Sequence, residues 1–284
     1  MAEHHNDVQL IEITPNGVQY PRSDWARSWR KFKREMNQVV YLVRWRLMER
    51  TFGRILGPIW VILDPIIQSA VYFFILGAVF NIKGTDVSFL SIFLMITLWK
   101  LHANLIYGAP TLLTGQATIL QQTNFPMSVI LMEYFGNEIC LFFMNFVIIV
   151  FVLALAGVYP NAAWLYLPFI LVTQLAFTLL CTLIITGAGT FVRDLGTIVN
   201  VGTTMWFYGS PVVYSMERVG EPYRTVLELI NPLCHILPAY RSVVFDGQVT
   251  EFFPLLGYLV ASLIGLVIVL RVMDRVRNRV YQYL

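Results

Sequence analysis

Residues 127–156 read MSVILMEYFGNEICLFFMNFVIIVFVLALA, and this stretch decides the fold class. Its only charged residues are Glu133 and Glu138. A helix of ~20 apolar residues crosses the hydrocarbon core of a bilayer, so the stretch is long enough to span a membrane. The whole chain agrees, because 57% of its 284 residues are hydrophobic and 13% are charged, against roughly a quarter charged in soluble domains. The sequence therefore predicts an integral membrane protein.

Five further apolar stretches lie on either side of this one, and each is close to or longer than the ~20 residues that a spanning helix needs. Prolines in the first two predict kinks, and small polar residues dilute the fifth. We therefore expect an all-α integral membrane protein with six transmembrane helices, formed by residues 55–284. The other five stretches are 55–80, 88–113, 163–191, 197–215 and 252–271.

Two shorter apolar pieces, around 223–231 and 233–245, precede the last stretch. Pro222, Pro232 and Pro238 interrupt them, and neither piece is long enough to cross a membrane. We expect two short re-entrant or interfacial helices here, which gate the outer end of the protein.

The N-terminal part of the chain differs from the rest. Residues 1–24 are polar and predict an extended cytoplasmic arm without a cleavable signal peptide. In residues 25–54, apolar residues recur at three- and four-residue spacing between basic ones, which predicts an amphipathic helix along the membrane surface. The apolar residues are Trp25, Trp29, Phe32, Met36, Val39, Val40 and Val43, and the basic ones include Arg27, Arg30, Lys31, Arg34 and Arg44.

The Lys and Arg residues are unevenly distributed along the chain. With six spans, both ends lie on one side of the membrane, and 15 of the 20 Lys and Arg residues fall on that side. Four fall on the other side, and Lys100 lies inside a span. Because cytoplasmic loops carry an excess of Lys and Arg, we expect both termini to be cytoplasmic.

The sequence lacks the usual catalytic and nucleotide-binding motifs. None of its four lysines follows a glycine, so the phosphate-binding loop G-x-x-x-x-G-K-[ST] is missing. The three cysteines and four histidines lack the spacing of a zinc site or a disulfide framework. We therefore expect no enzyme activity, no metal, no cofactor and no nucleic-acid partner. If nucleotide hydrolysis drives this protein, another chain performs it.

Short motifs occur in an informative order from about residue 40 to the C-terminus. Leu56-Gly57-Pro58-Ile59-Trp60 and Asp64-Pro65 begin the first span, and Ser210-Pro211-Val212-Val213-Tyr214 ends the fifth. Together with the predicted topology, the set resembles the polysaccharide-export permeases of the ATP-binding-cassette class. Arg54 and Lys100 depart from the family pattern, as does the long N-terminal arm. The remaining matches are Phe125-Pro126, Arg193-Asp194, Asn231-Pro232 and Tyr240-Arg241.

The resemblance implies a membrane subunit that exports a lipid-linked glycan, such as O-antigen, capsule or teichoic acid, across the bacterial plasma (inner) membrane. It implies a homodimer with two nucleotide-binding ATPase subunits, which bind the ATP. The loop 115–126 resembles the coupling helix that docks on the ATPase, although an ordinary polar connector explains it too. Its polar residues are Gln116, Gln121, Gln122 and Asn124, and the turn with Arg193 and Asp194 is a second candidate contact.

A glycan path through lipid needs surfaces on which sugar rings can stack and slide, and aromatic faces provide them. Aromatic residues also occur at membrane interfaces and in helix packing, so that alternative stays open. The candidates in the first and fifth spans are Trp60, Tyr72, Phe73, Trp206, Phe207 and Tyr208.

Ionisable residues at membrane depth are costly and therefore point to function. Lys100 is a candidate for the substrate path, and a lysine–glutamate pair between adjacent helices is the structural alternative. Asp64 is a functional candidate as well, and capping a broken helix before Pro65 is its structural alternative. Four arginines are candidates for binding the substrate's diphosphate or a phospholipid headgroup, while plain attraction to anionic lipid is worth ~1 kcal/mol each. These are Arg44, Arg46, Arg50 and Arg54.

Three other functions remain open. A permease of the same class that moves a drug or a small lipid needs fewer aromatic residues along its path. An ion-driven secondary transporter or channel works without an ATPase and shows symmetry between the halves of the chain. A membrane-embedded transferase would use Asp64, Glu133 or Glu138, but no acidic cluster lies on a loop.

Overall fold

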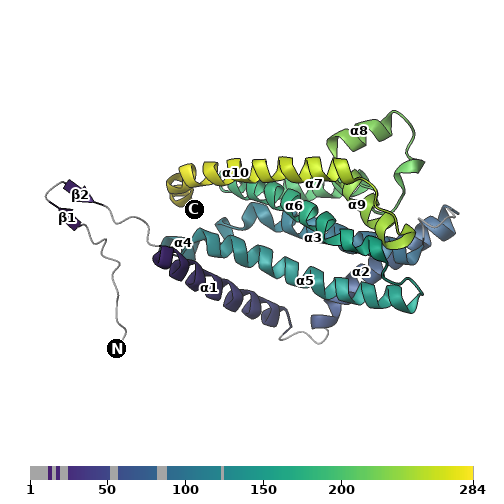
Figure 1. Ribbon diagram of the computed structural model, residues 1–284, viewed down its shortest axis with the longest axis horizontal. Coiled ribbons are helices and arrows are strands. Elements are labelled where there is room, and N and C mark those ends of the chain that lie inside the picture. Colours follow the sequence, from purple (N-terminus) through teal and green to yellow (C-terminus); the bar gives the residue numbers. More distant parts are fainter. Residues whose placement is uncertain are drawn as a thin grey trace.

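The computed structural model describes residues 12–14, 17–19, 25–51, 57–81, 88–122 and 125–283. Most of its long helices run along the longest dimension of a bundle (Figure 1). The α-helices are α1 (Trp25–Thr51), α2 (Gly57–Phe74), α3 (Phe89–Gly108), α4 (Ala117–Gln122), α5 (Met127–Leu155), α6 (Leu167–Gly189), α7 (Leu195–Tyr208), α8 (Tyr223–Ile230), α9 (Leu233–Arg241) and α10 (Phe252–Tyr283).

Shorter elements join or extend these helices. In the N-terminal arm, strands β1 (Glu12–Thr14) and β2 (Gly17–Gln19) form a small antiparallel hairpin. The other described elements are helical, so the prediction of an all-α integral membrane protein is confirmed for the membrane domain. The short helical turns are η1 (Ile75–Val79), η3 (Ala109–Thr111), η4 (Thr114–Gln116), η5 (Ala162–Tyr166), η6 (Met216–Arg218) and η7 (Ser242–Asp246).

The six predicted spans correspond to α2, α3, α5, α6, α7 and α10. In the part of the chain that the structure describes, four helical stretches are long and apolar enough to cross a bilayer. The apolar part of α2 with η1 is shorter, and α7 has only 14 residues, which at 1.5 Å per residue gives about 21 Å. Six spans therefore stay a prediction. The four long stretches are Phe89–Thr111, Met127–Leu155, Ala162–Gly189 and Phe252–Val276.

Helix α7 ends at Tyr208, although the apolar pattern predicts a span that continues to residue 215. Gly209 and Ser210 follow the helix, and Pro211 has no N–H with which to continue it. The N–H of Val212 instead donates to the carbonyl of Ser210 at 2.7 Å, and the chain turns. The predicted end was wrong because apolarity alone does not show where a helix stops.

Helix α3 lies at the centre of the bundle, where it packs against α2, α5, α6, α7 and α9. A helix that is apolar on every side is typically buried, and 14 of the 20 residues of α3 are buried. Helix α10 lies on the outside against α6, and 11% of its apolar window is buried, against 78% for α3. The large apolar surface that α10 leaves exposed suits contact with lipid.

Glycine residues permit close contacts between helices, as two described positions illustrate. A Cβ atom at Gly189, the last residue of α6, would lie 2.2 Å from the carbonyl oxygen of Pro110 in η3. A Cβ atom at Gly265 of α10 would lie 2.7 Å from Leu180 of α6. Small residues at such positions let helix backbones approach each other closely.

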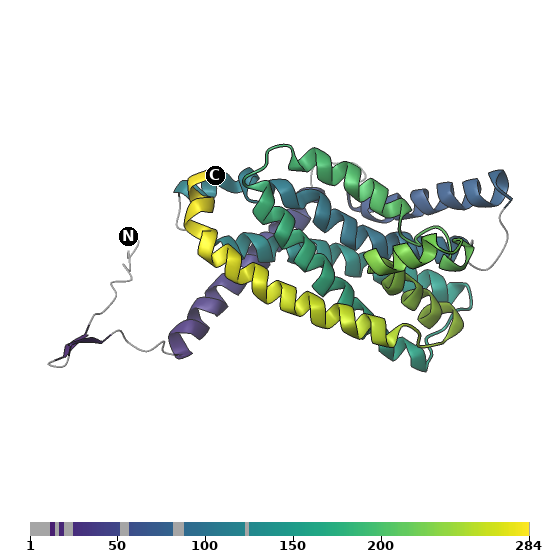
Figure 2. The ribbon, with the colours of Figure 1, turned by 90° about the horizontal axis from the view of Figure 1, so that it is seen from above.

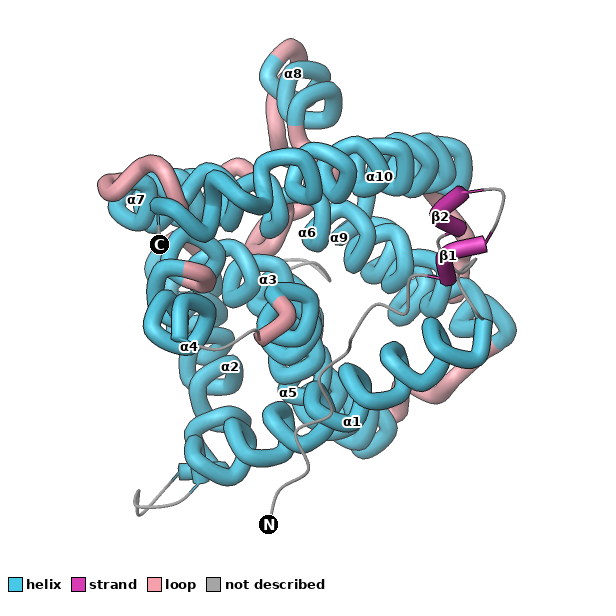
Figure 3. The backbone as a smooth tube through the Cα atoms, turned by 90° about the vertical axis from the view of Figure 1, so that its left-hand side faces the viewer, coloured by secondary structure: helices cyan, strands magenta, loops and turns pink. Residues whose placement is uncertain are grey.

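The two ends of the bundle carry different elements. The start of α1, helix α4, the α6–α7 turn and the end of α10 lie at one end, which we name the α4 end (Figures 1 and 3). Helices α8 and α9 lie at the opposite end, which we name the α8 end. Figure 2 shows α1 crossing the bundle obliquely on its way from the α4 end.

The two short helices predicted before the last span are present as α8 and α9. Helix α9 packs into the bundle and buries residues such as Ile236 and Tyr240. Helix α8 projects from the bundle (Figure 3), and its Arg224 pairs with Glu228 at 2.8 Å, which raises the pKa of the arginine. Whether either helix enters the membrane stays a prediction.

Candidate functional site

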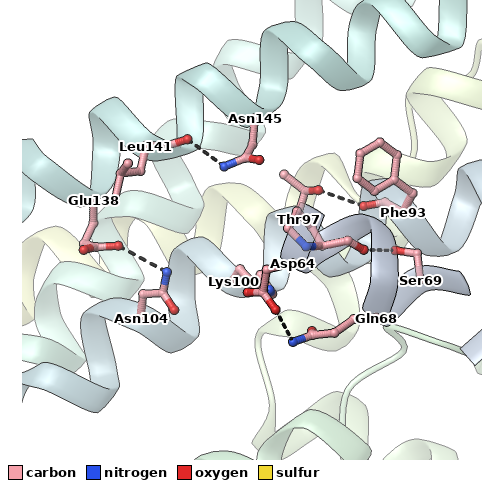
Figure 4. Close-up of polar contacts among 11 residues, drawn as sticks. Asp64, Gln68, Ser69, Phe93, Thr97, Lys100, Asn104, Glu138, Leu141 and Asn145 are labelled. Carbon is pink, nitrogen blue, oxygen red and sulfur yellow. Dashed lines mark hydrogen bonds and ion pairs between the residues drawn. The ribbon is translucent and has the colours of Figure 1, made fainter. Parts of the chain in front are cut away.

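Lys100 forms an ion pair that joins α3 to α2. Its Nζ atom contacts Oδ2 of Asp64, while Nε2 of Gln68 donates to Oδ1 of the same carboxylate at 3.1 Å (Figure 4). The Lys100 side chain is 19% exposed and that of Asp64 is 57% exposed. The alternative of a pair between adjacent helices therefore occurs with an aspartate and not with a glutamate. Asp64 also does not cap a break, because α2 continues through Pro65.

Next to this pair, aromatic side chains of α2, α3 and α7 meet. The rings of Tyr72 and Phe207 lie 5.5 Å apart between centroids, and those of Trp99 and Phe207 lie 5.5 Å apart edge to face. Tyr208 follows Phe207 and is 61% exposed. The structure therefore brings together candidates from the two predicted spans, with Trp99 as an unpredicted neighbour.

Trp206 points into the bundle core. Its ring packs edge to face against His102, at 4.7 Å between centroids, and His102 is fully buried. His102 also stacks on Phe177, and its Nδ1 lies 2.8 Å from Oγ1 of Thr178. This packing is the structural alternative that was left open for the aromatic residues, and it describes Trp206 well.

Asn231 anchors the end of α7 to the start of α9. Its Oδ1 accepts from Nε1 of Trp206 at 2.8 Å and from the N–H of Leu233 at 3.1 Å. Its Nδ2 donates to the carbonyl of Gly209 and to Oγ of Ser210, each at 2.9 Å. Sequence reasoning included Asn231 in a motif but gave it no role, because its partners at the end of α7 lie more than 20 positions away.

Trp60 and Phe73 lie apart from this cluster. Trp60 is 50% exposed on α2, and Phe73 is 43% exposed and packs edge to face against Phe89. Their place in a substrate path stays a prediction.

A polar edge runs along α7 beside Phe207. Asn200, Thr204 and Tyr208 recur every four residues, and all three are exposed. Helices α2 and α7 both pack on α3, and the exposed Asp64 and Gln68 of α2 are polar as well. We name these five exposed residues the α2–α7 face.

A second ion pair joins α1 to α5. Nε of Arg46 lies 2.8 Å from Oε1 of Glu133, whose side chain is 5% exposed, while that of Arg46 is 36% exposed. Arg44 lines an apolar groove of about 690 Å³ between the same helices. Headgroup binding by the arginines stays a prediction. Arg54 lies outside the described residues, and only the backbone of Arg50 is described.

Substituting Arg46 with alanine should destabilise the protein, because it removes the cation opposite the buried carboxylate of Glu133. Since Arg46 is partly exposed and its charge is screened, we expect a loss of about 1–3 kcal/mol, measured by thermal unfolding in detergent. Arg44→Ala is the matched control. Arg44 lies two residues earlier in the same helix, and its replacement should change stability by less than about 0.5 kcal/mol. Equal losses in both variants would contradict the role of the pair.

Polar contacts also connect the exposed Asn104 of α3 to buried residues of α5. The carboxylate of Glu138 accepts from Nδ2 of Asn104 at 3.2 Å (Figure 4). It also accepts from Nδ2 of Asn137 at 3.0 Å. The hydroxyl of Tyr134 donates to the carbonyl of Asn104 at 2.8 Å. Sequence reasoning noted the charge of Glu138 but missed the amides that compensate it.

The predicted coupling residues lie at the α4 end. Gln116 closes η4, α4 contains Gln121 and Gln122, and Arg193 and Asp194 are exposed in the α6–α7 turn. Asn124 lies outside the described residues, and only the backbones of Gln121 and Gln122 are described. The turn η3, which precedes η4 and α4 in the chain, packs against both α6 and α7. It therefore brings the loop that contains α4 close to the α6–α7 turn. Contact with an ATPase stays a prediction.

Four long apolar helices, one of which is the buried central helix α3, define the class of this molecule, an all-α multi-pass membrane protein. The sequence pattern of the ABC-2 type transporter family matches residues 37–245. The chain therefore belongs to the ABC-2 type transporter family, and is the membrane subunit of a transporter that works with an ATP-binding partner subunit.

Curated relatives point in the same direction. The chain is 23% identical over 227 residues to an O-antigen export system permease protein RfbA of Myxococcus xanthus. This match covers 80% of this chain and 87% of the relative. Two proteins of the same name from Klebsiella pneumoniae are each 25% identical to it. The match to the first covers 80% of this chain and 89% of the relative. The match to the second covers 81% of this chain and 90% of the relative.

Proposed function

We propose that this chain is the permease subunit of an ATP-driven exporter that moves a lipid-linked polysaccharide across the bacterial plasma membrane. The observation that carries the proposal is the similarity, over about four fifths of the chain, to three permeases named for O-antigen export. The α2–α7 face beside an aromatic cluster supports it, because a glycan needs both hydroxyl partners and surfaces for stacking.

In this proposal the chain forms a homodimer and binds two ATPase subunits at its α4 end. Helix α4 and the α6–α7 turn support this assignment, since both lie at that end (Figures 1 and 3). The sequence has no phosphate-binding loop of its own, so the ATP and its hydrolysis belong to the partner. The chain then needs no cofactor.

The α2–α7 faces of the two copies line the path for the glycan. Both helices expose polar side chains at mid-bundle, where contact with lipid would be costly. Two such faces opposite each other give a polar passage, with Tyr72, Phe207 and Tyr208 as its stacking surfaces. The arginines of α1 attract the diphosphate of the substrate as it enters from the cytoplasmic side.

The α4 end faces the cytoplasm, and both termini lie there. The bias of 15 of 20 Lys and Arg residues toward this side supports the orientation. Helices α8 and α9 then lie at the outer surface, where they gate the exit.

The test is export in cells that lack this protein. We expect surface polysaccharide to disappear and lipid-linked glycan to accumulate inside, and a plasmid copy should restore export. Inactivating the ATP-binding partner should have the same effect as the deletion, because the chain has no energy source of its own.

Each rival function has its own outcome in this test. Normal surface polysaccharide with altered drug sensitivity would replace the proposal with a drug permease. Transport that continues after the partner ATPase is inactivated would replace it with an ion-driven transporter.

A further inference from the structure

Lys100 holds an unusual position in the chain. Between Arg54 and Arg193 the sequence contains only two basic residues of the Lys or Arg type, Lys83 and Lys100. Lys100 lies near the middle of α3, with the buried Trp99 and Leu101 on either side. A cation at this depth is costly and has to be compensated by an anion.

The anion that compensates Lys100 is the carboxylate of Asp64, and surrounding side chains leave it exposed. The ammonium group of Lys100 is shielded, with 19% of the side chain exposed, whereas Asp64 is 57% exposed. The carboxylate therefore lies between the ammonium and the open side of α2, with Gln68 as its second partner (Figure 4).

The Arg46–Glu133 pair shows the opposite arrangement. There the carboxylate is 5% exposed and the arginine reaches toward the surface. In that pair the carboxylate of Glu133 is shielded from the surroundings, as expected for a link between two helices. An open carboxylate at mid-bundle is stable only where water or polar groups meet it, because acyl chains would not solvate it.

The surroundings of the open pair fit a phosphate group that is attached to a sugar. Gln68 and Tyr72 follow Asp64 at four-residue intervals along α2, which places Tyr72 about 12 Å further toward the α8 end. Tyr72 packs against Phe207, and Tyr208 is exposed beside it. A cation and an aromatic surface are thus aligned along the bundle.

We propose that Lys100 is a binding site for the phosphate that joins lipid and glycan in the substrate, and that Asp64 is its exchangeable counter-ion. An arriving phosphate displaces Asp64 from the ammonium, so Lys100 is never left uncompensated. The released carboxylate keeps Gln68 and gains water. This inference rests on the proposed function and adds to it a site and a ligand chemistry.

The experiment compares three variants of the full transporter, Lys100→Met, Asp64→Asn and the double variant. The probe is a long-chain polyprenyl diphosphate without sugars, and its binding is measured by the shift in thermal unfolding of the detergent-purified complex. We expect Lys100→Met and the double variant to bind the probe at least ~10-fold more weakly, which is the effect of losing one charge-assisted hydrogen bond. Asp64→Asn should bind it more tightly, because the competing carboxylate is gone.

The double variant keeps the test decisive if Lys100→Met alone does not fold, because it leaves no unpaired charge in the bundle. If the double variant binds the probe like the natural protein, the pair is purely structural and the inference is overturned. Equal displacement of the probe by phosphatidylglycerol would assign the site to membrane phospholipid and would also overturn it.

Export in cells separates this inference from the proposed function. If the natural protein fails to restore surface polysaccharide, the proposed function fails. If it restores export and the double variant does so equally well, only the role of Lys100 fails.

Discussion

Replacing Gly189 with alanine is expected to destabilise the protein and to abolish most of its export activity. The new Cβ atom would lie 2.2 Å from the carbonyl oxygen and 2.7 Å from the Cα atom of Pro110. These are backbone atoms, so η3 and the end of α6 would have to separate. Overpacking of this kind typically costs about 1–3 kcal/mol, which thermal unfolding in detergent measures.

Gly187→Ala is the matched control for this change. It lies two residues earlier in the same helix, and nothing lies within 4 Å of the position of its Cβ atom. Alanine is the better helix former by about 1 kcal/mol, so this variant should be as stable as the natural protein or slightly more stable. If both variants lose stability equally, helix propensity or detergent sensitivity explains the loss, and the close contact does not.

The loss at Gly189 should also have a functional signature. Helix α4 and the α6–α7 turn lie on the two sides of this contact. If they dock on the ATPase as proposed, separating them should lower the amount of glycan exported per ATP hydrolysed. This ratio is measured with the assembled transporter. A ratio equal to that of the natural protein would restrict Gly189 to a role in stability.

The second large effect is expected for Asn231→Leu. This buried side chain accepts two hydrogen bonds, from Trp206 and Leu233, and donates two, to Gly209 and Ser210. Leucine makes none of them and leaves buried polar groups without a partner, at about 1–3 kcal/mol per group. Because some of these groups can relax or reach water, we expect a net loss of about 2–4 kcal/mol.

Asn161→Leu is the control for this prediction. Asn161 is exposed, and its side-chain oxygen accepts a hydrogen bond from the N–H of Ala163 at the start of η5. Its loss should cost about 1 kcal/mol, as for other helix caps. Trypsin cleavage at Arg218 or Arg224 gives a second measurement, since releasing α7 from α9 should make the chain between them easier to cleave. A variant as stable as the control would contradict the role of Asn231.

Much of the fold could be predicted from the sequence, because a membrane-spanning helix requires a long apolar run and such runs are visible in one dimension. The helices α3, α5, α6 and α10 lie where these runs predicted them. The end of α7 could not be predicted in this way, since the apolar residues continue after Pro211 although the helix does not. The two short helices before α10 were predicted from length and proline positions.

The site was harder to predict, because it depends on which helices pack together. The charge of Lys100 pointed to function, but its partner Asp64 is 36 positions away and lies on a helix that periodicity does not place beside α3. Likewise, the partner of Glu133 is Arg46, which comes from the N-terminal helix. Pairwise partners of this kind follow only from three-dimensional packing.

Because other helices surround α3 on nearly every side, the bilayer does not dictate its composition. Helix α10 must remain apolar because it faces the hydrocarbon of the bilayer, but one apolar residue can replace another there. Helix α3 can bury polar residues such as Thr97 and His102, because protein side chains and not lipid surround it, but the packing leaves no room for larger side chains. Natural variation in this protein should therefore change size on the outer helix and polarity on the inner one.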